Sequence, residues 1–74
     1  MIRVSRGRCL LHDLISSRGW THEQYAYMSG RSPRMIDYFC STQRIMKPED
    51  IYVAMKIFKC GIEDIYEFHE HAAD

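Results

Sequence analysis

The chain has 74 residues, of which 27% are charged, and a formal net charge of zero. This length allows one domain. Its three cysteines, an odd number without a C-x-x-C pair, exclude a disulfide scaffold and indicate free thiols in a reducing compartment. No apolar run approaches the roughly 20 residues of a membrane-spanning helix, and none resembles a signal peptide. We therefore expect a cytoplasmic protein without membrane contact.

The charges are unevenly distributed along the chain. Residues 1–47 contain eight basic and three acidic residues, a formal charge of +5, whereas residues 48–74 contain two basic and seven acidic residues, a formal charge of −5. A basic half can bind a polyanion while an acidic half faces away or meets a partner. A nucleic-acid partner therefore stays open despite the net charge of zero, although chance clustering on a solvated surface would look the same.

The first elements are an arm and a helix. Alternation of Ile2 and Val4 with polar residues predicts a short extended N-terminal arm over residues 1–7. Leu11, Leu14 and Ile15 then fall at helical spacing and predict a helix over residues 8–18. Gly19 supplies its C-terminal stop.

Two short helices follow, each with clear start signals. Thr21 is a good N-cap, and Gln24 three residues later completes a capping box for a helix over residues 22–29. Gly30 breaks this helix. Ser32 is the next N-cap and Pro33 occupies the first helical position, where its missing N–H costs nothing, so a second helix is predicted over residues 33–40.

The remainder is predicted to be helical as well. A polar loop over residues 41–47 precedes a helix from Pro48 to about residue 60, which Gly61 ends. Ile62, Ile65 and Phe68 then form the stripe of a short fifth helix over residues 62–68, and residues 69–74 are expected to be a frayed tail. The predicted fold is therefore all-α, a compact five-helix domain over residues 8–68.

Residues 21–40 indicate which kind of all-α fold is expected. The two helices have about eight residues each, and the turn between them is centred on Gly30, which can adopt the left-handed conformation that a tight turn requires. Ala26 is small where the helices are expected to cross, and Ile36 and Phe39 are placed to anchor the second helix in the core. This arrangement predicts a helix-turn-helix rather than a four-helix bundle.

The order of these residues resembles the XRE family of Cro and phage-type repressors over roughly residues 9–68. The matching positions are Leu11, Leu14, the run Arg18-Gly19-Trp20-Thr21, Glu23, Ala26, Gly30, Ser32, Ile36, Phe39, Pro48 and the run Ile62-Glu63-Asp64-Ile65-Tyr66. The resemblance implies a lambda-repressor-like helix-turn-helix domain. It also implies a DNA-binding transcriptional regulator of bacterial or phage origin, with repression favoured over activation because so small a domain has little surface left to recruit polymerase.

In this motif the second helix, residues 33–40, enters the major groove of double-stranded DNA. The residues expected to read base edges are Pro33, Arg34, Asp37, Tyr38 and Ser41. The residues expected to contact phosphates are Thr21, His22, Arg31, Gln43, Arg44 and Lys47. Arg34 is the first candidate because a guanidinium can bond a guanine in two places.

Three positions depart from the family pattern. His22 stands where the family usually has Gln, Arg31 stands where an apolar residue usually follows the turn glycine, and Asp37 would oppose phosphates although it can accept from cytosine. With the neutral net charge and five tyrosines, they keep open a protein-binding module, such as an antirepressor or adaptor, that does not bind DNA specifically. The DNA-binding subunit of a toxin–antitoxin pair is a further alternative.

The remaining expectations concern partners and chemistry. The family usually binds DNA as dimers, and the fifth helix, with Ile65, Tyr66 and Phe68, is the expected homodimer surface, to which the arm can add. We find no nucleophile–base set and no paired carboxylates, so no enzyme activity is expected. No Cys/His pattern has zinc-site spacing, and His69 and His71 would point to opposite sides of a helix, so neither a metal nor a cofactor is expected.

Overall fold

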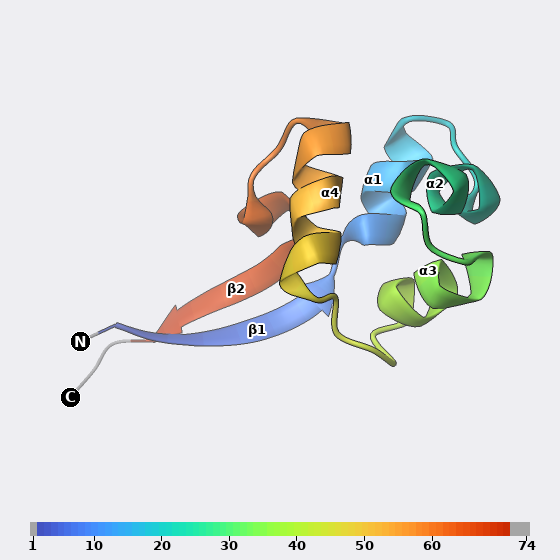
Figure 1. The fold of residues 1–74 in the computed structure, drawn as a ribbon. Coiled ribbons are helices and arrows are strands. Elements are labelled where there is room, and N and C mark those ends of the chain that lie inside the picture. Colours follow the sequence, from blue (N-terminus) through green and yellow to red (C-terminus); the bar gives the residue numbers. More distant parts are fainter. Residues whose placement is uncertain (1, 72–74) are drawn as a thin grey trace.

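The computed structural model describes residues 2–71, and Figure 1 shows the order of its elements. They are β1 (Arg3–Cys9), α1 (Leu11–Ser17), α2 (His22–Ser29), α3 (Pro33–Cys40), α4 (Pro48–Phe58), the 3-10 turn η1 (Ile62–Asp64) and β2 (Tyr66–His71).

Helices α2 and α3 have the predicted bounds, and their caps explain why. The Thr21 hydroxyl accepts from the Gln24 amide at 3.2 Å, while the Gln24 side chain accepts from the Thr21 amide at 2.8 Å. The Ser32 hydroxyl accepts from the Met35 amide at 3.2 Å. Gly30 ends α2 in the left-handed region at φ +75°. These local bonds satisfy backbone donors at the helix starts, so the two helices are defined by their own sequence.

The predicted all-α, five-helix fold is wrong. Residues 66–71 form a strand, β2, which pairs antiparallel with β1 to make a two-stranded sheet, and η1 is the part of the expected fifth helix that is helical. Tyr66 and Phe68 alternate with Glu67 and His69, a two-residue period that suits a strand. The apolar stripe from Ile62 to Phe68 fitted a helix equally well, and only the distant partner strand decides between the two.

The same pairing changes the ends of the predicted elements. The expected arm is β1, which continues to Cys9, so α1 begins at Leu11 rather than at residue 8. Helix α4 ends at Phe58 because Lys59 adopts a left-handed conformation at φ +52°. Residues 69–71 of the expected tail belong to β2. Residues 72–74 lie outside the described part of the chain.

One glycine allows the two strands to approach. The register pairs Arg6 with Phe68 and Cys9 with Tyr66, so three steps along β1 oppose two along β2, and the irregularity contains Gly7. A Cβ atom at Gly7 would lie 2.9 Å from Cβ of Glu67 and 2.8 Å from Nε2 of His69. A larger residue would therefore push the strands apart.

The core lies between the helices and the inner end of the sheet. Its buried side chains are Cys9, Leu11, Ile15, Tyr25, Ala26, Ile36, Phe39, Met46, Ala54, Phe58, Ile65 and Tyr66. Trp20 is half-buried at the corner between α1 and α2, with its ring 5.6 Å from that of Phe58. The phenolic oxygen of Tyr66 accepts from the buried Met46 amide at 3.0 Å. β2 is thereby joined to the loop before α4.

The outer end of the sheet projects from the helical body (Figure 1). The molecule measures 45 × 24 × 20 Å along its principal axes. The projecting part of the two strands, residues 2–6 and 68–71, is exposed. Among residues 2–71, no helix combines the length and the apolar character needed to cross a bilayer.

Replacing Tyr66 with Phe should destabilise the fold while preserving its shape. The substitution removes the acceptor of the Met46 amide, and an unsatisfied buried donor costs about 1–3 kcal/mol. Each kcal/mol should lower the melting temperature by about 4–8 °C in a domain of this size. Thermal unfolding followed by circular dichroism measures this. Tyr52→Phe, which loses an exposed hydroxyl, is the matched control and should melt like the wild type; equal melting of both variants would contradict the role of this bond.

Candidate nucleic-acid interface

The outward face of α3 is formed by the residues that the sequence predicted for base readout. Ile36 and Phe39 are buried and anchor the helix. Pro33, Arg34, Asp37 and Ser41 are exposed, and Tyr38 is half-buried. The helix therefore turns one apolar face to the core and one polar face to solvent. This is the orientation that a recognition helix requires.

Arg34 is the cation on this face that stays available. Its side chain forms no ion pair or hydrogen bond with another described residue. It lies in the first turn of α3, directly after Pro33. A free guanidinium in this position can form two parallel hydrogen bonds with a planar acceptor edge.

Tyr38 and Arg44 form a second unit beside that face. The guanidinium of Arg44 lies 5.5 Å from the centroid of the Tyr38 ring. The carbonyl of Tyr38 accepts from the amides of Gln43 and Arg44 at 2.9 and 3.3 Å. It also accepts from the Ser41 hydroxyl at 3.3 Å. The loop after α3 is thus folded back onto the helix end, and its exposed polar residues Gln43 and Arg44 lie near the outward face.

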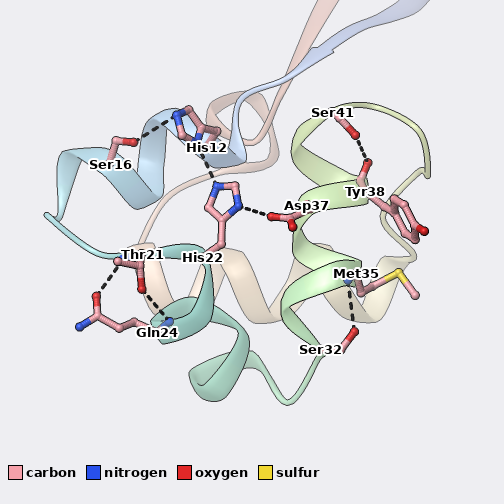
Figure 2. Close-up of polar contacts among 10 residues, drawn as sticks. All are labelled: His12, Ser16, Thr21, His22, Gln24, Ser32, Met35, Asp37, Tyr38 and Ser41. Atoms are coloured by element: carbon pink, nitrogen blue, oxygen red, sulfur yellow. Dashed lines mark hydrogen bonds and ion pairs between the residues drawn. The ribbon is translucent and has the colours of Figure 1, made fainter.

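Asp37 is bonded to His22, which changes the role of both residues (Figure 2). Nδ1 of His22 lies 2.5 Å from a carboxylate oxygen of Asp37. Nε2 of the same ring lies 3.0 Å from Nδ1 of His12. Both ring nitrogens of His22 are therefore engaged inside the protein. His22 is half-buried, and a contact with a phosphate would require it to release one of these partners.

Arg31 is also engaged, in an ion pair with a buried acid. Its Nε lies 2.6 Å from Asp50, whose side chain is 8% exposed, while the Arg31 side chain is 41% exposed. The second oxygen of Asp50 accepts from the Lys47 amide at 3.2 Å. Asp50 thus joins the turn after α2 to the start of α4. The pair gives a structural reason for an arginine directly after the turn glycine, and the Arg31 side chain remains partly exposed.

The residues predicted to contact phosphates therefore differ in how available their side chains are. Gln43, Arg44 and Lys47 are exposed, whereas Thr21 forms the capping box of α2. The uneven charge distribution is partly neutralised by the fold, because β1, which contains three arginines, pairs with the acidic β2. Arg8 lies 3.5 Å from Glu67 and 3.5 Å from Asp13. The basic surface next to α3 consequently rests on few residues.

The expected dimer residues are placed differently. Ile65 and Tyr66 are 0% and 1% exposed and belong to the core, so they cannot form a surface. Phe68 is 37% exposed. It is paired with Arg6, and Val4 lies two residues before Arg6 in β1, so Phe68 and Val4 lie on the same face of the sheet.

The sequence did not reveal two potential metal-ligating residues near the outward face of α3. His12 and Cys40 approach His22, and one ring nitrogen of each histidine and the cysteine sulfur all lie within 4.8 Å of one another. Burial, followed by the neighbouring Cys9, Asp37 and Asp13, raises the pKa of Cys40 to about 12. The three residues are 10 and 18 positions apart, so no spacing in the sequence indicated that they meet.

Comparison of the chain with protein-family models, curated proteins and solved structures found no match.

Replacing Asp50 with Asn should destabilise the protein by about 1–3 kcal/mol. This range lies between those of exposed and fully buried ion pairs, since Arg31 is partly solvated. Urea unfolding measures the change as a lower midpoint at unchanged slope. The neighbouring Glu49→Gln, which removes an exposed charge in the same turn, should change stability by less than about 0.5 kcal/mol. A similar midpoint for both variants would mean that the pair does not hold α4.

Proposed function

We propose that this chain is a cytoplasmic, sequence-specific DNA-binding regulator of bacterial or phage origin, with repression as its expected effect. Helix α3 would lie in the major groove of double-stranded DNA, and α2 would cross the backbone above it. The observation that carries the proposal is the pair of capped eight-residue helices joined at Gly30, with the outward face of α3 polar and Arg34 free.

The contacts follow from which side chains remain unpaired. Arg34 is the base-reading residue, with Pro33, Tyr38 and Ser41 beside it. Asp37 would read a base only after leaving His22. The phosphate contacts fall to Arg44, Lys47 and Gln43, together with the backbone amides at the start of α2. Thr21, His22 and Arg31 are secondary because each already has a structural partner.

A homodimer would double this small interface, and the exposed ribbon is the surface that we propose for it. Val4 and Phe68 lie on one sheet face and are 54% and 37% exposed, and Ile2 beyond the strand end is 71% exposed. An isolated two-stranded sheet is marginally stable in water, so burial of this face against a second copy would stabilise it. The same surface patch would be used by both copies, as in a two-fold dimer.

A protein-binding module is the second candidate, and one observation favours it. Tyr27 is 91% exposed and Met28 is 43% exposed on α2, next to the half-buried Trp20. Large amphipathic side chains of this kind are enriched at protein interfaces. In this case the fold would be kept and specific DNA binding lost.

A selection from random double-stranded DNA at about 150 mM salt, a physiological ionic strength, tests the proposal directly. An enriched motif with dyad symmetry is expected. Arg34→Ala should then weaken binding by about 1–3 kcal/mol and relax the preference at one base position per half-site.

Lys56→Ala is the control, because it removes the same charge from α4 and should leave the motif intact. The affinity should also fall with salt, with a logarithmic slope of about −0.9 for each phosphate contact. If no motif is enriched while the protein is folded and in excess, the protein-binding module becomes the better proposal. An unchanged motif in Arg34→Ala would mean that another element reads the bases.

Replacing Phe68 with Asp should convert the dimer to a monomer without unfolding it. The side chain is already 37% exposed, so a charge is tolerated in the monomer but is costly in a dry interface. Sedimentation equilibrium over a range of concentrations measures the mass. Tyr52→Asp places the same charge at an exposed aromatic residue on α4 and should leave the association unchanged. A wild-type chain that stays monomeric at high concentration would overturn this surface.

A further inference from the structure

Three side chains with metal-binding chemistry meet where α1, α2 and α3 come together. They are His12 from α1, His22 from the start of α2 and Cys40 from the end of α3. We propose that they form a binding site for a divalent transition-metal ion of the Zn²⁺ class.

The spacing of the donor atoms supports a shared ion. Nδ1 of His12 and Nε2 of His22 lie 3.0 Å apart, and the sulfur of Cys40 lies within 4.8 Å of both. Two imidazole nitrogens on one tetrahedral zinc ion, each at about 2.0–2.1 Å from it, are about 3.3 Å apart. The separation of the two nitrogens is therefore already close to that of a zinc site, so the rings must turn toward the ion rather than move apart, and Cys40 must approach by about 1 Å to complete the set.

The orientation of His22 is the one that zinc ligands adopt. The Asp37 carboxylate lies against Nδ1, so this nitrogen carries the proton and Nε2 presents its lone pair toward His12 (Figure 2). A carboxylate behind a coordinating histidine fixes the tautomer and increases the basicity of the ligand nitrogen. The Ser16 hydroxyl lies 3.4 Å from Nε2 of His12, behind that ring, so the other ring nitrogen, Nδ1, faces the site.

This donor set defines the class of ion. Two imidazoles and a thiolate suit borderline and soft ions such as Zn²⁺, whereas Mg²⁺ and Ca²⁺ prefer oxygen ligands. Binding deprotonates the Cys40 thiol, so that a Zn–S bond forms as the S–H bond breaks and the proton passes to solvent. Water fills the fourth position of the tetrahedron, because His12 is exposed and a surface hollow lined by these residues, Asp13 and Ser41 leads to the site.

The ion would add a link between α1, α2 and α3 at the point where His22 already contacts His12 and Asp37. The metal site requires neither DNA nor a second chain, so its test is independent of the test of the function proposed above. A ligand that binds only the folded state stabilises it in proportion to the logarithm of its concentration. We therefore expect Zn²⁺ at about a hundredfold excess over its dissociation constant to raise the melting temperature by at least about 10 °C.

Titration of the reduced full-length chain with Co²⁺ tests the site, because cobalt reports its ligands by absorption. One equivalent should produce ligand-field bands and a thiolate-to-cobalt charge-transfer band, and Zn²⁺ should abolish both at the same stoichiometry. Mg²⁺ should not compete. Absence of a thiolate band at one equivalent would overturn the proposal.

Matched variants assign the ligands. Cys40→Ser should remove the charge-transfer band, whereas Cys60→Ser should retain it. His12→Ala removes an exposed side chain and cannot unfold the core, so it keeps the test valid if Cys40→Ser folds poorly; it should weaken Co²⁺ binding. His71→Ala should have no effect. A band that persists in Cys40→Ser, a band that is lost in Cys60→Ser, or an unchanged Co²⁺ affinity in His12→Ala would contradict the assignment.

Asp37 acts as a positioning residue in this site. Asp37→Asn should lower the affinity for Zn²⁺ by about 10–100-fold while the cobalt spectrum keeps its shape, because the ligands themselves are unchanged. Glu23→Gln, an exposed charge loss in the first turn of α2, should leave the affinity as it is. Equal affinities for the Asp37→Asn variant and the wild type would show that the carboxylate does not orient His22.

Discussion

The pairing of the two ends of the chain through Tyr66 is the constraint on which the structure depends. Tyr66 is 1% exposed, lies opposite Cys9 in the sheet and accepts from the Met46 amide. Next to it, the Ile65 carbonyl accepts from the Leu10 amide at 2.6 Å, just before α1 begins. These bonds fix both the entry to α1 and the entry to α4. The helix-turn-helix therefore rests on a core that is closed by the strands, and loss of the sheet would expose that core.

The sequence predicted α2 and α3 correctly because their signals are local. Caps at Thr21 and Ser32 and the turn at Gly30 act within a few residues, and no distant contact is needed to interpret them. The sheet could not be predicted in the same way. The apolar residues from Ile62 to Phe68 have helical spacing, the alternation of a strand covers only residues 66–69, and β1 lies more than 50 residues away. Backbone pairing across that distance overrides the local pattern.

The outward face of α3 consists of the residues that the sequence placed there, but several of them have partners that the sequence did not predict. The outward residues of α3 are exposed as expected, yet His22, Arg31 and Asp37 each have a partner that no linear pattern indicates. Arg31 follows the turn glycine, and its pair with Asp50 gives a structural reason for an arginine there. Such compensating pairs join residues that are far apart in the sequence. They leave fewer unpaired positive charges for a nucleic acid than the number of basic residues in residues 1–47 suggests.

The two roles open to His22 exclude each other. Its Nδ1 is held by Asp37, and its Nε2 faces Nδ1 of His12, where the proposed metal ion would bind, so a phosphate could be met only after one of these partners is released. A ring that uses both nitrogens inside the protein cannot also donate to DNA. A bound cation would nevertheless place positive charge next to the start of α2, where the helix dipole already favours an anion. The position of His22 is thus better explained by its contacts with α1 and α3 than by direct contact with DNA.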